Sequence, residues 1–417
     1  MWQAVQDKLK YYAMASMVFA MGVGVRYVTY WSPAPVDPTR SGAFIDVSMS
    51  ESPAIVEQTQ THLTWQVPFV TLRRFDAVTG DFVGDGDQLL YGMSAVKLPA
   101  YRGRGSLALA PADQPPSDSH VIRLQDDQLE EGAFYQVVRQ LVDRSKRRDV
   151  LVFVHGFNVT FNEAVCRAAQ LGVDMPFDGV MLAFDWNSAA SNLGYFRDKQ
   201  TTQQSAPALA GVLAELRAQL DPDVRIHVLA HSMGNRYLLN ALQLLTNYQP
   251  LIGMPREEVS RLTTGLTSGL LKPQFSGWEL WHPRLGEPSP LTHVVFAAPD
   301  VEPATFQSSL PAIGRIAQSM TLYCSESDFA LDLSRYVNGQ GKSGFRVGDA
   351  RSGMTRGLDI VRLKGVSQRD PFGHSYYGNH PGLLTDLSLL LQQDLSLPQR
   401  PTVIAGTWFD EGKWFLR

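Results

Sequence analysis

The stretch from Ile226 to Gly234 reads IHVLAHSMG, and it decides the fold predicted for this chain. An apolar run typical of a buried strand ends in a small-x-Ser-x-small pentapeptide centred on Ser232. The residues that follow, 235–245, have the apolar spacing of a helix that buries one face. A serine on a sharp turn between a strand and a helix is the context of a nucleophile elbow, and the small residues Ala230 and Gly234 fit the tight turn.

The pentapeptide alone is weak evidence for such an elbow. A chain of this length would show roughly 0.3 such matches by chance if small residues occur at background frequency. The other interpretation of Ser232 is a helix N-cap, because serine commonly caps a helix at a strand–helix junction. The rest of the chain must therefore decide between a nucleophile and a cap.

Length and composition indicate a globular protein. The chain has 417 residues, enough for one large domain or two average ones, of which 44% are hydrophobic and 19% charged. The net charge of −4 and the lack of a basic stripe argue against a nucleic-acid partner. The two cysteines, Cys166 and Cys324, are too few for a disulfide scaffold or a cysteine-rich metal site.

The N-terminus carries a hydrophobic segment. Residues 11–25 are uncharged and mostly apolar, which suits a signal peptide or an anchor but falls short of the ~20 residues that span a bilayer. A buried or surface amphipathic helix is the alternative. The Pro-rich residues 32–38 read as a linker. We therefore expect residues 1–38 to form a separate segment, with possible membrane association and a location in the cell envelope rather than the cytoplasm.

Strand–helix alternation begins near residue 130 and predicts a mostly parallel sheet with helices on both faces. Apolar runs mark strands at 150–154, 180–184, 226–230, 293–298, 320–324 and 358–363. The periodicity predicts helices at 130–145, 161–172, 200–219, 235–247, 303–318 and 328–336. Upstream, residues 64–72 and 89–98 predict an antiparallel strand pair separated by a Gly/Asp-rich turn.

Polar residues follow these strands where each one ends. Ligands of a parallel α/β sheet bind at the carboxyl ends of its strands, so these residues should share one edge. Taken along the chain, they are His155, Asp185, Ser232, Asp300, Asp328, His374 and His380. A nucleophile, acids and histidines therefore fall at the same edge, in the chain order Ser, Asp, His.

This set has the chemistry of nucleophilic catalysis. A serine hydroxyl needs a base to take its proton, and the base needs a carboxylate that holds its tautomer. His374, on a loop after the last strand, is preferred as the base over His380. Asp328 is preferred over Asp300 as the acid, because it follows the strand next to that loop, although either aspartate could cap a helix instead.

Acyl transfer also needs donors for the oxyanion of the tetrahedral intermediate. The backbone N–H of Met233, directly after the serine, supplies one. The backbone N–H of Phe157 supplies the other, since Gly156 lets its loop come close to the serine. A plain turn at the end of the strand is the alternative interpretation of this loop.

Several motifs occur together in one order: FVHGFN at 153–158, AHSMGN at 230–235, AAPD at 297–300, LYCS at 322–325 with DFAL at 328–331, and HSYY at 374–377. The ordered set resembles the α/β-hydrolase fold and, more narrowly, the DUF900 group of bacterial esterase/lipase-like hydrolases, over roughly residues 65–390. The resemblance implies a triad of Ser232, Asp328 and His374.

From the residues and this resemblance we expect a serine hydrolase that cleaves a carboxylic ester, from a small molecule or a lipid, through an acyl-enzyme. No metal or organic cofactor is needed. A thioesterase, amidase, peptidase or acyltransferase would use the same triad, and a non-catalytic envelope or interaction protein on the same fold is the alternative from another class.

The expected domain organisation follows from the same patterns. The hydrolase domain is predicted at 39–400 and a C-terminal tail at 401–417. Residues 248–291 are longer and less regular than a plain connection, which is typical of a lid or a binding loop. The aromatic residues of this insertion could cover an acyl pocket, pack on the core or bind a partner.

Overall fold

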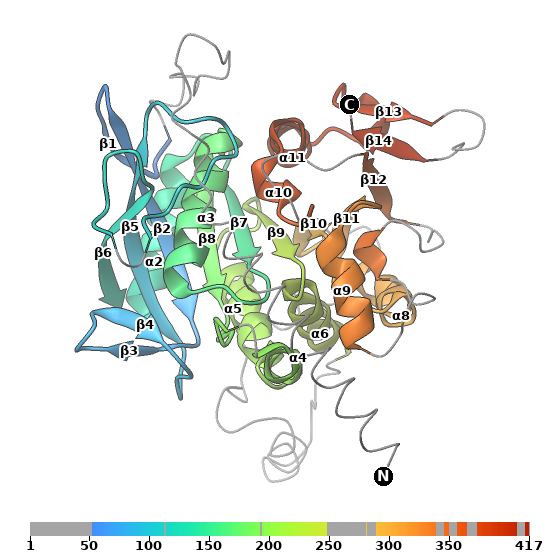
Figure 1. Cartoon of the computed structure of the whole chain (residues 1–417), viewed down its shortest axis with the longest axis horizontal. Helices are drawn as coiled ribbons and strands as arrows, with labels where there is room; N and C mark the ends of the chain where they lie inside the picture. Colours follow the sequence, from blue (N-terminus) through green and yellow to red (C-terminus); the bar gives the residue numbers. More distant parts are fainter. Residues whose placement is uncertain are drawn as a thin grey trace, which may run out of the picture.

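The computed structural model describes most of the chain from residue 52 onward (Figure 1). The described residues are 52–111, 114–191, 194–247, 281, 289–338, 346–349, 357–364, 373–406 and 413–416. The predicted N-terminal segment 1–38 and nearly all of the predicted lid 248–291 lie outside these residues. Of the helices in the described ranges, none is long and apolar enough to cross a bilayer.

Six parallel strands form the centre of the main sheet, in the order β8-β7-β9-β10-β11-β12. Their bounds are β7 Asp149–Val154, β8 Gly179–Asp185, β9 Arg225–His231, β10 Leu291–Ala297, β11 Ala317–Ser325 and β12 Asp359–Leu363. Every residue of β7, β8 and β10 is buried, because helices cover both faces of the sheet. The predicted α/β-hydrolase architecture is confirmed.

Antiparallel strands extend the sheet on its N-terminal side. They are β1 Ile55–Gln58, β2 His62–Thr71, β5 Leu90–Pro99 and β6 Ile122–Leu129. The predicted pair of β2 and β5 is antiparallel, and β2 also joins β8 in parallel. Strand β6 was not predicted, because its sequence IRLQDDQL is mostly polar; it is an edge strand with no fully buried residue.

Short strands account for two further differences. Next to the predicted Gly/Asp turn, β3 (Arg74–Asp76) and β4 (Asp81–Val83) pair as a separate hairpin. The predicted tail contains β13 (Val403–Ala405) and β14 (Trp414–Leu416), and β14 pairs in parallel with β12. Three-residue strands are too short to show a hydrophobic period, so only the pairing reveals them.

Helices pack on both faces of the sheet (Figure 1). Along β7, Val150, Val152 and Val154 join the core on one face, while Leu151 and Phe153 join the core on the other. The first face carries α2 Glu131–Arg144, α4 Tyr195–Gln204, α5 Ala206–Gln219, α6 Gly234–Asn247, α8 Pro303–Ile313 and α9 Phe329–Val337. The second face carries α3 Phe161–Asp174, α10 Tyr376–Asn379 and α11 Pro381–Gln393. Two short 3-10 helices are η5 Val347–Asp349 and η6 Leu397–Gln399.

Two predicted helices differ from the structure. The helix predicted at 200–219 is two helices, α4 and α5, that meet at Ser205, and Pro207 stands in the first turn of α5. Proline suits a helix start because that position needs no N–H donor. The helix predicted at 303–318 ends at Ile313, since β11 already begins at Ala317.

Candidate active site

The turn between β9 and α6 holds Ser232 in a left-handed backbone conformation, with φ of +53°. Such a conformation is strained for a residue with a side chain and persists only where neighbours hold it. Here the Ser232 N–H donates to Ala297 O over 3.0 Å, and the Asn235 amide donates to Ser232 O over 3.0 Å. Gly234 is required beside it, because a Cβ there would lie 2.3 Å from His155 O.

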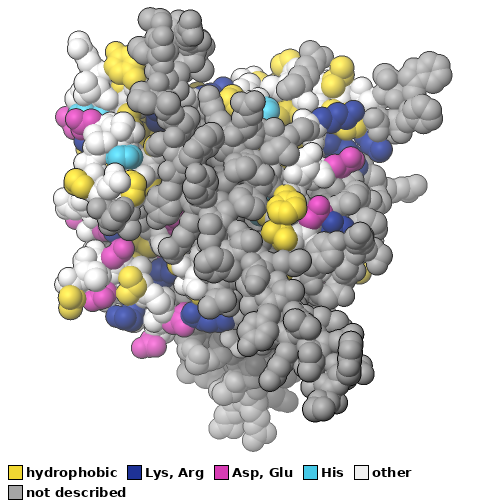
Figure 2. All heavy atoms as spheres, in the orientation of Figure 1, with side chains coloured by type: hydrophobic (Ala, Val, Ile, Leu, Met, Phe, Trp, Pro, Cys, Tyr) yellow, Lys and Arg dark blue, Asp and Glu magenta, His cyan; other side chains and the backbone are white. Residues whose placement is uncertain are grey.

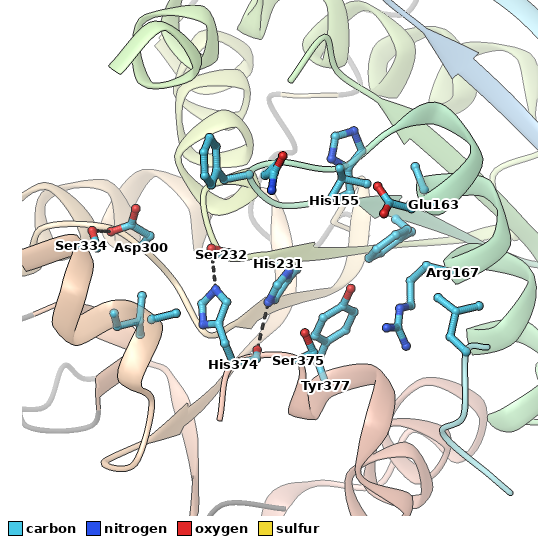
Figure 3. Close-up of a pocket in the computed structure, with 18 of the residues that line it drawn as sticks. His155, Glu163, Arg167, His231, Ser232, Asp300, Ser334, His374, Ser375 and Tyr377 are labelled. Carbon is cyan, nitrogen blue, oxygen red and sulfur yellow. Dashed lines mark hydrogen bonds between the residues drawn. The ribbon is translucent and has the colours of Figure 1, made fainter. Parts of the chain in front are cut away.

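The structure brings Ser232, His374 and Asp328 into one hydrogen-bonded line. Figure 3 shows the part of it that joins Ser232 to His374. Ser232 Oγ lies 2.7 Å from His374 Nε2. On the other side of the ring, His374 Nδ1 lies 2.8 Å from Asp328 Oδ2 and 3.0 Å from Asp328 Oδ1. A carboxylate can only accept, so it favours a proton on Nδ1 and leaves Nε2 free to accept from the serine hydroxyl.

Asp328 serves two purposes at the start of α9. Its Oδ1 accepts from the Leu331 N–H over 3.1 Å, as a helix cap does, while both oxygens face His374. The side chain is fully buried, and the turn before it is tied by the Ser327 N–H, which donates to Ser325 Oγ over 3.2 Å. The two interpretations offered by the sequence, cap and acid, are therefore compatible in one residue.

A second histidine, His231, contacts the backbone of the loop that carries His374. Its Nε2 lies 3.1 Å from His374 O, so Nε2 must donate. Its ring stacks on that of Tyr377 with centroids 4.1 Å apart. Burial, reinforced by the proximity of His374, holds the pKa of His231 well below its usual range. His231 is therefore a neutral donor that anchors the His374 loop, a role the sequence analysis did not assign although His231 stands beside the serine.

The two competing candidates have other partners. His380 caps α11, where its Nδ1 accepts from the Leu383 N–H over 3.3 Å. Asp300 lines the same pocket but accepts from Tyr195 Oη over 2.8 Å and from Ser334 Oγ over 2.6 Å. The structure places neither of them against the His374 ring.

Asp300 is ionised, and nearby guanidinium groups balance its charge. Burial by itself would raise the pKa of this carboxyl, but the guanidinium groups of Arg236 and Arg346 outweigh it and lower the pKa to about 2. Arg346 Nε lies 3.2 Å from Asp300 Oδ1. The backbone N–H of Asp300 donates to Ser232 O over 3.2 Å, so this residue supports the elbow through its main chain.

The loop after β7 lies against the serine. A Cβ added to Gly156 would be 3.0 Å from Ser232 Cβ, so only glycine allows this approach. Within the described part of the chain, the N–H groups of Phe157 and Met233 donate to no protein acceptor. Both predicted oxyanion donors are therefore available for a ligand.

A buried ion pair fixes this loop, and the sequence analysis missed its arginine. His155 Nε2 lies 2.9 Å from Asp185 Oδ1, and Arg73 Nε donates to Asp185 Oδ2 over 2.9 Å. Arg73 also donates to Val159 O over 2.8 Å and to Ser188 O over 3.0 Å. Arg73 thereby ties the loops after β7 and β8 together. It follows the end of β2, where the sequence predicts no site residue.

The pocket above Ser232 is lined by apolar and charged side chains. Leu107, Phe153, Phe157 and Leu331 contribute apolar surface, and Arg167 is among the charged residues. Within the described ranges, no group of three or more His, Cys, Asp or Glu side chains is arranged to hold a metal ion.

The described surface of the protein carries mixed charge in one view. On the face drawn in Figure 2, the described residues show basic and acidic side chains interspersed with apolar ones. Such a pattern is typical of an ordinary globular surface, and no face made of one charge sign stands out among the described residues in this view.

Comparisons with known proteins show the family of this chain. The model of the family described as "Alpha/beta hydrolase of unknown function (DUF900)" matches residues 130–393, which include Ser232, Asp328 and His374. An uncharacterized protein of Nostoc, alr1448, is 25% identical over 136 residues, which are 27% of this chain and 35% of that protein. The match thus spans about a third of the length of this relative.

Proposed function

Since the chain belongs to the DUF900 family of alpha/beta hydrolases, we propose that it is a serine hydrolase that cleaves a carboxylic ester through an acyl-enzyme. One observation carries the proposal: the buried line of Asp328, His374 and Ser232, with 2.8 and 2.7 Å between successive partners, ends in a serine on a strained turn. A serine that only capped α6 would need neither the histidine nor the carboxylate.

In the first step, Ser232 Oγ attacks the ester carbonyl carbon while His374 Nε2 takes the hydroxyl proton. The tetrahedral intermediate then collapses: the bond to the alcohol oxygen breaks, His374 returns its proton to that oxygen, and the acyl group stays on Ser232. Water repeats the sequence, so the acid leaves and the serine regains its proton.

The negative charge of the tetrahedral intermediate needs preorganised donors. In the ranges that the structure describes, the N–H groups of Phe157 and Met233 have no protein acceptor, so both can serve this purpose. Removal of one such donor in serine hydrolases costs about 10²- to 10³-fold in kcat. Asp328 acts as a positioning residue, because it touches the ring of His374 and not the substrate.

A fluorophosphonate probe tests the proposal directly, because it phosphonylates only an activated serine. We expect one label per chain on the wild-type protein and none on Ser232→Ala. Ser375→Ala is the matched control, since Ser375 lines the same pocket beside His374 and should leave the labelling of Ser232 unchanged. Absence of labelling on folded wild-type protein would favour a non-catalytic interaction protein.

The leaving group is tested separately. Rates on an ester, a thioester and an anilide with the same acyl chain should rank the ester first by kcat/KM. A higher kcat/KM for the thioester or the anilide would assign the triad to a thioesterase or an amidase. Transfer of the acyl group to an added alcohol faster than to water would indicate an acyltransferase.

A further inference from the structure

Arg167 lies in the candidate pocket and has no acidic partner among the described residues. It projects from α3, is 6% exposed and lines the same pocket as Ser232. In Figure 3 it lies on the side of the pocket opposite Asp300 and Ser334. The ester chemistry proposed above makes no use of this cation.

The contacts of Arg167 are to neutral groups. Its Nη1 donates to Gln170 Oε1 over 2.7 Å and to Asn379 Oδ1 over 3.0 Å, and its guanidinium lies 5.6 Å from the ring centroid of Tyr377. Among the described residues, no carboxylate oxygen lies within 4.0 Å of it. Its Nε and Nη2 atoms have no acceptor among the described residues either. Two donor nitrogens on one edge of the planar guanidinium can therefore bind a ligand.

Several other buried arginines of this chain have carboxylate partners, whereas Arg217 donates to backbone carbonyls outside the pocket. Arg73 pairs with Asp185 at 2.9 Å, Arg102 with Asp174 at 2.6 Å and Arg400 with Asp386 at 2.7 Å. Burial of a charge is costly unless it is paired. An arginine that departs from this pattern inside a pocket is therefore a candidate for pairing with a ligand.

The two nearest carboxylates on α3 are already engaged. Glu163, one turn before Arg167, accepts from the Thr160 N–H over 2.7 Å in a capping box. Asp174 accepts from Arg102 and from the Gly105 N–H over 2.8 Å. Neither is within ion-pair distance of Arg167, so its charge is left for another partner.

We propose that the substrate carries a carboxylate that binds the Arg167 guanidinium while its ester carbonyl lies at Ser232. The inference rests on the proposed function and names the substrate class of that site. A carboxylate matches the fork of a guanidinium with two parallel hydrogen bonds. A singly charged group is favoured over a phosphate dianion, because the Glu163 carboxylate lines the same pocket and would repel the second charge.

The surface near the arginine indicates what joins the two groups. Phe153 and Tyr377 line the pocket with Arg167, and their rings stack with centroids 6.0 Å apart. Such a wall suits an aliphatic or aromatic linker. The substrate class is thus an ester with an apolar body and a terminal carboxylate, on either its acyl or its alcohol portion.

Two kinds of substrate pair tell these portions apart. For the acyl portion, nitrophenyl half-esters of adipate, suberate and sebacate are compared with the same esters whose free carboxyl is methylated. For the alcohol portion, carboxyphenyl octanoate is compared with its methyl-capped form. Wild type should prefer the charged member of one pair, and in Arg167→Gln the ratio of kcat/KM for charged over neutral substrate should fall roughly 10- to 100-fold.

Two further variants separate binding from folding. Arg167→Lys keeps the charge without the fork and should retain part of the preference. Arg104→Gln is the matched control: Arg104 donates to Thr385 Oγ1 and to Asp174 O, and it does not line the pocket. Its charged-to-neutral ratio should equal that of wild type, and thermal melts show that each variant is folded.

The failures of the two proposals are distinguishable. Wild type that labels with fluorophosphonate but shows no preference for the charged member of either pair overturns the carboxylate inference and leaves the hydrolase intact. If no ester is cleaved, titration calorimetry of suberate monomethyl ester with Ser232→Ala still tests the site. If Ser232→Ala binds this ester and the double variant Ser232→Ala/Arg167→Gln does not, the inference is supported. If Ser232→Ala itself does not bind the ester, the inference is overturned.

Discussion

Replacing Asp328 by asparagine should lower kcat by about 10³- to 10⁴-fold while the protein remains folded. Both oxygens of this buried carboxylate face His374 Nδ1, at 2.8 and 3.0 Å, and hold the proton on that nitrogen. An amide can turn its NH2 group toward the ring, which then carries its proton on Nε2. That nitrogen, 2.7 Å from Ser232 Oγ, would no longer accept the hydroxyl proton.

The magnitude follows from what is lost and what is kept. A factor of 10³ to 10⁴ corresponds to about 4 to 5.5 kcal/mol of transition-state stabilisation. The helix cap survives, because the amide oxygen of asparagine can still accept from the Leu331 N–H that Asp328 now bonds over 3.1 Å. Stability should therefore change much less than kcat.

Asp300→Asn is the matched control. Asp300 is as buried as Asp328 and lies in the same pocket, but its oxygens accept from Tyr195 and Ser334 and face Arg346. Loss of one partner of a buried ion pair costs about 3–5 kcal/mol of stability. This variant should melt at a lower temperature and keep most of its kcat.

The assay is the initial rate on a soluble nitrophenyl ester at saturation, with a thermal melt of each variant. A greater loss of kcat for folded Asp300→Asn than for Asp328→Asn would transfer the acid role to Asp300. A loss below tenfold for Asp328→Asn would refute the tautomer argument itself.

Three other outcomes are expected. Gly156→Ala should lower kcat more than it changes KM, because its Cβ would press on Ser232 Cβ at 3.0 Å and displace the oxyanion loop; unchanged kinetics would contradict this packing. The unfolding free energy should fall as the pH drops from about 4.5 to about 2, because Asp300 and Glu302 have folded-state pKa values of about 2, below their ordinary ones. Their carboxylates therefore stabilise the fold above this pH window and lose that contribution within it. An unfolding free energy that stays constant over this window would refute the prediction. If residues 11–25 anchor the chain, the full-length protein should fractionate with membranes and a chain starting at residue 38 should not; identical fractionation of the two would exclude an anchor.

The order of the central elements could be predicted from sequence because their signals are local. Apolar runs such as the one before Ser232 are continuous in buried parallel strands, and helices between them show the 3.6-residue period. The rule that ligands lie at the carboxyl ends of such strands then brought Ser232, Asp328 and His374 to one edge. Short or exposed strands, such as β6 and β13, escaped because their residues alternate weakly or face solvent.

What the sequence determined by itself was therefore the elbow, the run of parallel strands and a short list of candidate acids and bases. Only the tertiary structure shows that His374 rather than His380 faces Ser232, from which it is 142 residues away in the chain. It also shows that His231 hydrogen-bonds to the backbone of the His374 loop. Only the tertiary structure shows that Arg167 lies inside the pocket with no acidic partner in the described part of the chain. Local periodicity records which face of an element is buried, whereas contacts between loops depend on strand order and on the path of each loop, which no local pattern encodes.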